Sequence, residues 1–565
     1  MLNFFKKNYI LIFLIIFSFL LLFSSAKFNS ATTDEGVHLY AGLTYLQKND
    51  FRLDTEHPPF LKELSAAVIN FFHPNLPQDG LWQKAGNFYY DSWQEARILS
   101  EDFFYKSGND PQKLILWGRF PFIILTLILG IFVYFWAKKL YGKKAGLFAG
   151  FLTLFFPNFL AHGILINTDV GLALFIFISV YFFGKYLKSS QLRTNWQNLV
   201  LCGLFTGLAF ASKFTSGFLI PIYLVLIIIN VILSKNIKIF FKFFCGLILI
   251  LTIGFLVVWM AYFFSFKIPP DPNLAENVSL WSGYNLSSSL QMAIEKNRIM
   301  LFPAEYYKGI FLVFRHAVSG HGSFLLGQTS NYGWWYYFPV AILYKTPIPI
   351  FVWLILSFFY FKKIRSKNIF DEYLLIIPII VFLGLSMFSK ANLGLRHILP
   401  IFPFVFIFIS KSINLVDFKT IKFMRVQKKV LIPALGFLIL ILWYLFSSVV
   451  TYPNYIAYFN EFAGGQKNYY KILVDSNLDW GQDAFRIKNY LDKNNIKTGY
   501  IFYPWNGDSA LEYYNINLQP LPWDGQGVKG KVVISSTYLQ LFGFDWLRKY
   551  PFEQITPGVF IFNVN

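Results

Sequence analysis

The sequence is poor in charged residues and in cysteine. Only 14% of its 565 residues are charged, whereas a water-soluble globular chain is about 25% charged, so an ordinary soluble enzyme is excluded. The two cysteines, Cys202 and Cys245, lie in or beside apolar runs, which excludes a disulfide scaffold and a Cys/His metal site. The sequence also lacks a GxxxxGK[ST] string, so it offers no P-loop for nucleotide hydrolysis.

What the chain has instead is apolar sequence. It is 55% hydrophobic with a mean hydropathy of +0.47, and several apolar runs reach about 20 residues, the length that crosses a bilayer. We therefore predict an all-α polytopic membrane bundle of about eleven transmembrane helices. The first run also fits a cleaved signal peptide. The predicted spans are 9–23, 114–136, 145–160, 169–187, 197–212, 217–234, 243–265, 345–361, 372–389, 397–411 and 430–450.

The formal net charge of +20 comes mainly from short basic loops between these runs. Positive loops face the cytoplasm, and one orientation satisfies every loop: the N-terminus is cytoplasmic and the C-terminus extracytoplasmic. We assign the excess charge to this topology and expect no nucleic acid partner. The lack of external disulfides favours a prokaryotic plasma membrane. The basic loops are 138–144, 185–193, 235–242, 362–365 and 411–429.

This topology divides the chain into two domains. Residues 1–450 form a transmembrane catalytic domain with long outer loops at 24–113 and 266–344, and residues 451–565 form a small extracytoplasmic α/β domain. In that tail, apolar runs typical of strands alternate with helical ones. The predicted strands are 471–474, 498–503, 531–535 and 559–564, and the predicted helices are 481–493, 509–514 and 538–549.

Carboxylates stand near the outer membrane surface at two places in the sequence. Asp34 and Glu35 follow the first span, and Asp169 begins a later one. A carboxylate there can accept a proton from a hydroxyl delivered from outside. The structural alternative is helix capping, because Thr32-x-x-Glu35 is a capping box for a helix at 33–47 and Asp169 suits a helix start. Both interpretations stay open, and they can hold together.

Cations gather on the same predicted face. Each alone fits a side chain that reaches toward the membrane interface, but together they break the positive-inside bias where it should be strongest. Such cations suit a lipid phosphate at that depth. They are Lys213, Lys345, Arg396 and His397, with Arg119 as a further candidate. His57, in Glu56-His57-Pro58-Pro59, fits either a phosphate ligand or a turn into an amphipathic surface helix at 60–72.

The simplest chemistry for such a site is group transfer from a lipid-phosphate donor. A carboxylate deprotonates the acceptor, and cations stabilise the departing phosphate. The alternative is an outer-leaflet lipid-headgroup transporter or flippase without chemistry. A transporter places its ionisable residues near the bilayer midplane, whereas here they are predicted at the outer boundary.

An ordered set of motifs extends over most of the chain. On these motifs the chain resembles the phospholipid-carrier-dependent glycosyltransferases of the GT-C superfamily, in particular the bacterial branch of the protein O-mannosyltransferase family (glycosyltransferase family 39), which is similar to the aminoarabinose transferases. The motifs are Thr33–Gly42, Glu56–Pro59, His162–Val170, Ala211–Thr215, Gly320–Gly327, Trp334–Pro339, Arg396-His397, Tyr452–Glu461 and Asp475–Asp483.

The resemblance implies an inverting transferase that uses a polyprenyl-phosphate sugar and an extracytoplasmic acceptor. It implies Asp34 as the base, Glu35 in support and Asp169 as the second acid. It leaves a divalent cation, Mg²⁺ or Mn²⁺, open at Asp34 and Asp169. The tail differs from that of eukaryotic protein mannosyltransferases, so protein, lipid and glycan all stay open as acceptors. The implied substrate-binding residues are His57, Lys213, Lys345, Arg396, His397 and His321.

Overall fold

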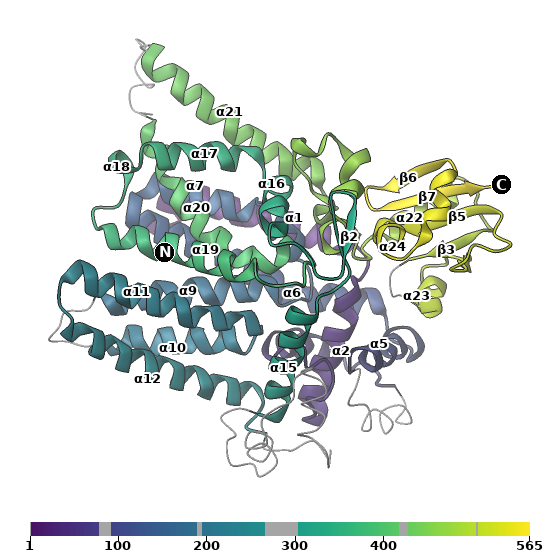
Figure 1. Cartoon of the computed structure of the whole chain (residues 1–565), viewed down its shortest axis with the longest axis horizontal. Coiled ribbons are helices and arrows are strands. Elements are labelled where there is room, and N and C mark those ends of the chain that lie inside the picture. The colour runs from purple at the N-terminus through teal and green to yellow at the C-terminus, as the bar shows by residue number, and fades with distance from the viewer. Residues whose placement is uncertain (1, 78–91, 189–194, 266–302, 417–427, 504–506) are drawn as a thin grey trace.

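The computed structural model describes residues 2–77, 92–188, 195–265, 303–416, 428–503 and 507–565. Parts of both predicted outer loops (78–91 and 266–302) and of the basic loops at 185–193 and 411–429 lie outside the described residues. The protein is mostly helical, and a small sheet near the C-terminus lies at one end of the helices (Figure 1). A polytopic helical membrane protein with a small C-terminal mixed domain is therefore confirmed.

Eight helices of the described residues are long and apolar enough to cross a membrane, or nine if one bent pair forms a single span. Of the eleven predicted spans, eight or nine therefore meet this length among the described residues. The eight are α1 (Leu2–Phe28), α6 (Pro111–Tyr141), α9 (Asp169–Leu187), α11 (Leu219–Ser234) with the turn η2 (Phe214–Phe218), α12 (Lys238–Ala261), α19 (Ile369–Ser386), α20 (Phe402–Ser410) with the turns η3 (Leu395–Ile401) and η4 (Lys411–Leu415), and α21 (Lys428–Thr451).

The differences from the prediction arise at prolines and at a short helix. The run predicted at 145–160 is divided into α7 (Lys143–Leu154) and α8 (Pro157–His162), because proline begins a helix readily but cannot continue one. The run at 345–361 corresponds to α17 (Ile348–Phe359), and its first residue ends the preceding helix α16 (Tyr337–Lys345), which is bent by 108° from α17 at Pro347. The run at 197–212 forms α10 (Trp196–Phe210), which has only 15 residues.

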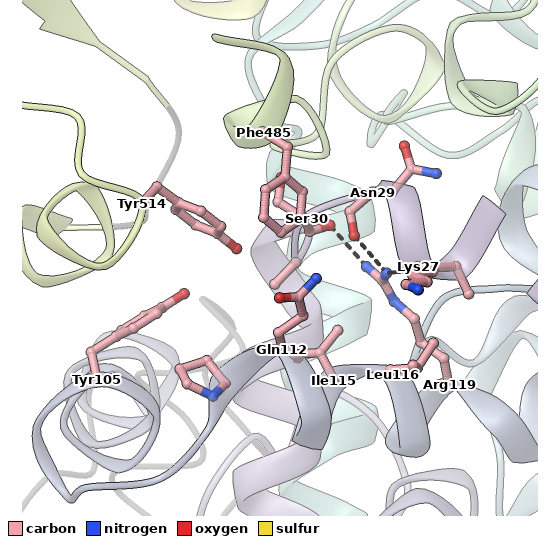
Figure 2. A pocket seen from close by; sticks show the side chains of 13 residues that line it. Lys27, Asn29, Ser30, Tyr105, Gln112, Ile115, Leu116, Arg119, Phe485 and Tyr514 are labelled. Carbon is pink, nitrogen blue, oxygen red and sulfur yellow. Dashed lines mark hydrogen bonds between the residues drawn. The ribbon is translucent and has the colours of Figure 1, made fainter. Parts of the chain in front are cut away.

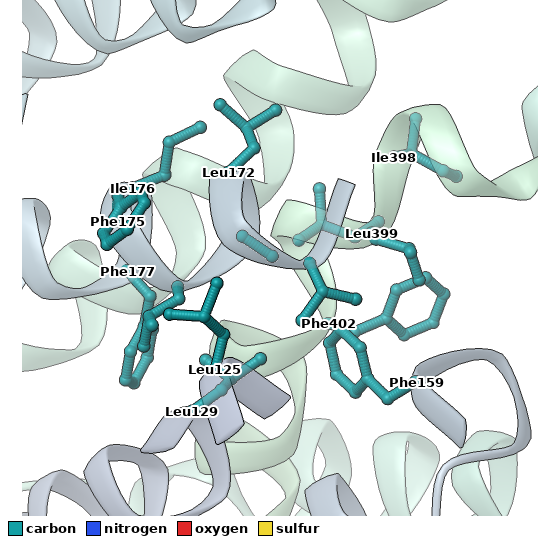
Figure 3. Packing of buried hydrophobic residues seen from close by; sticks show 14 of the residues in the cluster. Leu125, Leu129, Phe159, Leu172, Phe175, Ile176, Phe177, Ile398, Leu399 and Phe402 are labelled. Atoms are coloured by element: carbon teal, nitrogen blue, oxygen red, sulfur yellow. The ribbon is translucent and has the colours of Figure 1, made fainter. Parts of the chain in front are cut away.

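The core that fixes the site lies between α6, α9 and the η3–α20 segment (Figure 3). Leu125 and Leu129 of α6 pack there with Leu172 of α9 and with Leu399 and Phe402, all of them at most 9% exposed. Dense apolar packing of this kind allows little movement. It brings the first turn of α9 beside η3, although more than 220 residues separate them in sequence.

Two shorter helices follow the first span. The helix α2 (Thr33–Lys48) opens with the predicted capping box, in which Thr32 and Glu35 satisfy each other's backbone groups. The helix α3 (Phe60–Asn70) confirms the predicted amphipathic helix and packs against α2 and α6. Further helices on this side are α5 (Ser92–Glu101), the π-turn η1 (Asp102–Lys106) and α15 (Ala304–Ser319), followed by the hairpin β1 (Ser323–Leu325) and β2 (Gln328–Ser330).

The tail begins with four short 3₁₀ turns and then forms a five-stranded sheet of order β4-β3-β5-β7-β6. Strand β3 is parallel to β4 and β5, whereas β7 is antiparallel to β5 and β6. The turns are η6 (Tyr455–Ala457), η7 (Glu461–Ala463), η8 (Gln466–Lys471) and η9 (Asp475–Asn477). The strands are β3 (Tyr500–Phe502), β4 (Gln519–Pro520), β5 (Gly530–Ser535), β6 (Phe552–Thr556) and β7 (Val559–Val564), and the helices are α22 (Ala484–Lys493), α23 (Gly507–Tyr513), α24 (Ser536–Leu541) and the turn η10 (Phe544–Lys549).

Three of the four predicted tail strands are present, but the one at 471–474 is wrong. That segment ends the turn η8 and continues without strand pairing. Its residues Leu473 and Val474 are buried, and Leu473 belongs to the large apolar core that the membrane helices form. Strands β4 and β6 were missed, since both are short and largely exposed.

Candidate functional site

Two carboxylates and two cations form one cluster at the tail side of the helices. The Lys213 Nζ lies 2.5 Å from the Oδ1 of Asp169. The Nη1 of Arg396 lies 3.4 Å from the Oδ2 of Asp34 and 3.8 Å from the Oδ2 of Asp169. Residues that span more than 360 positions of sequence therefore share one site, and Asp34 and Asp169 face the same guanidinium.

Each of these side chains stands at the end of a helix. Asp34 lies in the first turn of α2, which the capping box fixes. Asp169 is the first residue of α9, Lys213 follows α10 directly, and Arg396 lies in the turn η3. Helix ends offer backbone groups and local field to charged side chains, so the termini of four elements converge on the cluster.

The two acids differ in their surroundings. The side chain of Asp34 is 18% exposed and its contact with Arg396 is long, whereas the side chain of Asp169 is 1% exposed and bonded to Lys213. Asp169 is therefore held in a buried ion pair, and Asp34 keeps access to solvent. A general base needs that access, because it must reach the proton of an incoming group.

Glu35, next to Asp34 in sequence, points the other way. Its carboxylate takes two contacts from Arg119, at 2.8 Å and 2.6 Å, and the amide N–H of Ile166 also donates to it. The guanidinium of Arg119 donates further to the carbonyl oxygens of Asn29 and Ser30 (Figure 2). Arg119, expected among the phosphate-facing cations, is instead fully buried. This pair braces the α1–α2 connection, and the supporting role expected for Glu35 stays a prediction.

Lys345 is also used for bracing. Its Nζ donates to the carbonyl oxygens of Ile456 and Asn477, at 2.8 Å and 2.5 Å, and lies over the ring of Phe459. The ammonium is buried and tied to the tail rather than to the acids. Its predicted contact with a carrier phosphate stays a prediction.

The histidines divide into two groups. His57 and His397 lie close enough to Lys213 for its charge to act on both rings, which places them beside the cluster. Burial and the neighbouring His38 hold the pKa of His57 well below its usual range, so this ring is neutral. His321 is different: it is exposed, and its Nδ1 lies 2.9 Å from the carbonyl oxygen of Gly322.

Behind His57 lies a second charge network. Asp54 accepts from the Nδ1 of His38 at 2.7 Å and from Lys62 at 3.1 Å. Lys62 also donates to the carbonyl oxygen of His57 at 2.7 Å. These buried contacts fix the Glu56–Pro59 turn, so that the ring of His57 keeps its place beside the cluster.

The cluster is rich in buried polar atoms without a protein partner. Buried polar groups are normally hydrogen-bonded, so several unpartnered atoms in one place indicate that something else binds there. Within the described part of the chain, the unpartnered atoms at or beside the cluster are Nδ1 of His57, Nδ1 of His162, Nδ2 of Asn167, Oδ2 of Asp169, Oγ1 of Thr215, Nε of Arg396 and Nε2 of His397.

The same residues do not fit a divalent cation. A metal ion bound between Asp34 and Asp169 would meet the guanidinium of Arg396, which lies within 3.8 Å of both. No group of three His, Cys, Asp or Glu side chains with metal-binding geometry occurs among the described residues. We therefore assign no step to a metal.

Sequence reasoning missed one contributor to the cluster, the tail residue Trp480. Its ring lies under the guanidinium of Arg396, with 4.1 Å from Cζ to the ring centroid. Its carbonyl oxygen also accepts from the backbone N–H of Thr33, next to Asp34. Trp480 belongs to one of the motifs that carry the resemblance, but nothing in a local sequence pattern indicates a contact with a residue 84 positions away.

Comparisons with known proteins agree with the motifs. Residues 113–259 match the family described as dolichyl-phosphate-mannose-protein mannosyltransferase. No curated protein sequence matches the chain. Among solved structures, the oligosaccharyltransferase AglB from Archaeoglobus fulgidus, in complex with an inhibitory peptide and a dolichol-phosphate, is 12% identical with a TM-score of 0.50, over 97% of this chain and 73% of that one.

A second similar structure is ArnT from Cupriavidus metallidurans bound to undecaprenyl phosphate. It is 13% identical with a TM-score of 0.48, over 98% of each chain. The match to AglB extends over nearly the whole chain and shows a shared fold. The family match over residues 113–259 agrees with the resemblance inferred from the motifs.

Proposed function

We propose that the chain is a member of the dolichyl-phosphate-mannose-protein mannosyltransferase family, whose model matches residues 113–259, and that it transfers a sugar from a polyprenyl-phosphate donor to an extracytoplasmic acceptor with inversion at the anomeric carbon. The observation that carries this proposal is the shared cluster, in which Arg396 lies between an accessible acid, Asp34, and a buried one, Asp169.

In the proposed reaction Asp34 is the base. The acceptor oxygen attacks the anomeric carbon, the bond from that carbon to the phosphate oxygen breaks, and the acceptor proton passes to the Asp34 carboxylate. The leaving group is the polyprenyl phosphate. Asp34 is favoured over Asp169 because it is the more exposed of the two and is held only by a long contact.

The cations bind the phosphate in this proposal. Arg396 and Lys213 stand beside both acids, and a guanidinium can bind two phosphate oxygens at once. The unpartnered Nε of Arg396 and Nε2 of His397 are further donors for the same group. Charge that develops on the leaving phosphate is stabilised by these positioned donors. His57 takes part as a neutral ring, and His321 stays at the exposed edge as an expected substrate contact.

The alternative of a headgroup transporter is less favoured. Its ionisable residues would have to lie near the bilayer midplane. Asp169 instead begins the span Asp169–Leu187, Lys213 precedes the span Phe214–Ser234, and Arg396 lies in the first turn of Leu395–Leu415. These positions, with the basic loops at the other ends of the helices, support a site at the outer surface of the membrane.

A transfer assay tests the function. Purified protein in detergent is incubated with a cell-envelope extract as the source of acceptor and with a panel of polyprenyl-phosphate sugars, including mannose and aminoarabinose, and release of polyprenyl phosphate is followed by mass spectrometry. We expect release from at least one donor, and a product of inverted anomeric configuration by NMR. Envelope glycans compared with and without the gene identify the acceptor. Headgroup translocation across vesicles without release would favour the transporter instead.

A further inference from the structure

The loop between Asp475 and Asp483 of the tail packs against both segments that carry the reacting groups. The carbonyl oxygen of Trp480 accepts from the backbone N–H of Thr33 at 3.1 Å. The backbone N–H of Leu395, next to Arg396, donates to the Oδ1 of Asn477 at 3.0 Å. The loop therefore connects the start of α2, which carries Asp34, with the start of η3.

Within this loop the indole of Trp480 lies face-on to Arg396. The Cζ of the guanidinium is 4.1 Å from the ring centroid, well within the range of a cation–π interaction. Trp480 is only 5% exposed, and the ring of His162 stands at its edge, 6.3 Å away. A desolvated contact of this kind is stronger than one at the surface, so the ring and the guanidinium hold each other.

The contacts of Arg396 are unusually long for a buried arginine beside two acids. They measure 3.4 Å and 3.8 Å, whereas Arg119 closes on Glu35 at 2.8 Å and 2.6 Å. A guanidinium with free access to a carboxylate adopts the close, two-pronged geometry. Arg396 does not adopt this close geometry with either acid. The ring of Trp480 covers one face of its guanidinium and so restricts its movement.

A third acid, Asp475, lies within electrostatic range of the cluster. Asp475, at the start of the loop, is half-buried, and the charges of Arg396, His321 and Asp34 all act on it. The tail thus adds an aromatic surface to the cluster. The loop 475–483 therefore lines the charge cluster directly through Trp480.

We propose that Trp480 is a positioning residue of the transferase reaction, whose indole face holds the guanidinium of Arg396 between Asp34 and Asp169 and so keeps its N–H groups directed at the donor phosphate. The tail then completes the site, and the membrane helices alone do not. This inference rests on the proposed function, and it names how one part of that site is held in place.

Two substitutions of similar bulk separate the aromatic face from simple packing. Trp480→Leu keeps an apolar side chain without a π face, and Trp480→Phe, which also shortens the side chain, keeps one. A buried cation–π contact is worth enough to expect about a 10-fold loss of kcat/KM in Trp480→Leu and a loss within about 3-fold in Trp480→Phe. Inhibition by added undecaprenyl phosphate should weaken in the same order. Equal losses in both variants, or no loss in Trp480→Leu, would overturn the proposal.

A double-mutant cycle with Arg396→Ala measures whether the two losses of kcat/KM are independent. A purely structural role of Trp480 predicts independent losses. If the ring acts through the guanidinium, Trp480→Leu should cost less than about 2-fold once Arg396 is absent, because the two changes remove one interaction. Multiplying losses would overturn the proposal. Trp523→Ala is the matched control, since this exposed tail tryptophan stacks on Phe544 and should leave inhibition unchanged.

The two levels of inference fail in different ways. If the wild-type protein releases no polyprenyl phosphate from any donor of the panel, the proposed function is wrong. If the wild type is active but the losses multiply, only the role of Trp480 is wrong. The thermal unfolding midpoint of each variant in detergent, compared with that of Trp523→Ala, distinguishes a lost contact from a lost fold.

Discussion

The same helices carry a charge cluster at each end, and the two clusters are built differently. At the tail end, Asp34, Asp169, Lys213 and Arg396 meet. At the opposite end, Glu372 accepts from Lys411 at 2.8 Å, from the hydroxyl of Tyr141 at 2.8 Å and from the backbone N–H of Ser366 at 2.7 Å. The second cluster also includes the pair formed by Lys188 and Asp371.

The difference lies in how fully each cluster is satisfied. Both oxygens of Glu372 have partners, and the ammonium of Lys411 is enclosed by the rings of Phe361 and Phe408. The tail-end cluster leaves Oδ2 of Asp169 and Nε of Arg396 without a hydrogen bond. Burying such atoms costs free energy. A fully paired cluster stabilises the fold, whereas an incompletely paired one leaves donors and acceptors for a ligand.

The largest effect should come from the accessible acid. We expect Asp34→Asn to reduce sugar transfer by at least about 100-fold, because a general base typically contributes that much or more. The variant should insert and unfold like the wild type, since the ion pair between Asp34 and Arg396 is long and Asp34 is partly exposed. Release of polyprenyl phosphate measures the loss. Normal transfer by Asp34→Asn would remove its assignment as the base.

Lysine variants at the two ends compare the clusters directly. Lys213→Ala and Lys411→Ala each remove an ammonium from a buried ion pair, so each should destabilise the protein by about 3–5 kcal/mol. Only Lys213→Ala should also weaken inhibition by undecaprenyl phosphate, by about 10-fold, because a charge-assisted contact is lost. If undecaprenyl phosphate inhibited Lys213→Ala and Lys411→Ala equally, the claim that only the tail-end cluster binds phosphate would be wrong.

The Glu35–Arg119 pair lies beside the site, but we expect it to contribute to stability like the fully paired cluster around Glu372. Arg119→Leu leaves the carboxylate of Glu35 buried and uncompensated, and we expect a loss of about 3–5 kcal/mol in stability. The paired variant Glu35→Gln, Arg119→Leu should recover part of it, measured as the thermal unfolding midpoint in detergent. Unchanged stability of Arg119→Leu would show that the pair is not a brace.

The smallest effect concerns an acid of the tail. Burial, and the nearby Asp483, raise the pKa of Asp479 to about 7 from its ordinary value of 3.8. The folded state thus binds a proton that the unfolded state releases, so stability from this group is lost as pH rises from about 4 to about 7. Asp479→Asn should flatten that decline. Unfolding midpoints at pH 5 and pH 8 test it: an unchanged slope in Asp479→Asn would contradict the raised pKa.

The sequence predicted much of the fold because hydrophobic length and period are local signals. Spans such as 169–187 and 114–136 correspond to α9 and α6, and the capping box at Thr32 and Glu35 is present. Prediction was wrong where a helix breaks at proline, as at Pro157 and Pro347, because hydropathy records apolar length and not bending.

The site was predicted in part. Asp34, Asp169, Lys213 and Arg396 do come together, as their positions at span ends suggested. Their roles in transfer stay predictions. The sequence could not distinguish a cation that faces the site from one that braces the chain, and so Arg119 and Lys345 were grouped with the others. A side chain's partners decide this, and they come from distant segments.

By itself, the sequence determined the class of this protein: a polytopic membrane chain whose acids and cations stand at one set of helix ends. Composition and periodicity act locally and suffice for that. The tertiary structure alone decided which charges are paired and which remain open, and that Trp480 of the tail lies against Arg396. The physical reason is that hydrogen bonds and ion pairs act over a few ångströms of space, at separations along the chain that no local pattern records.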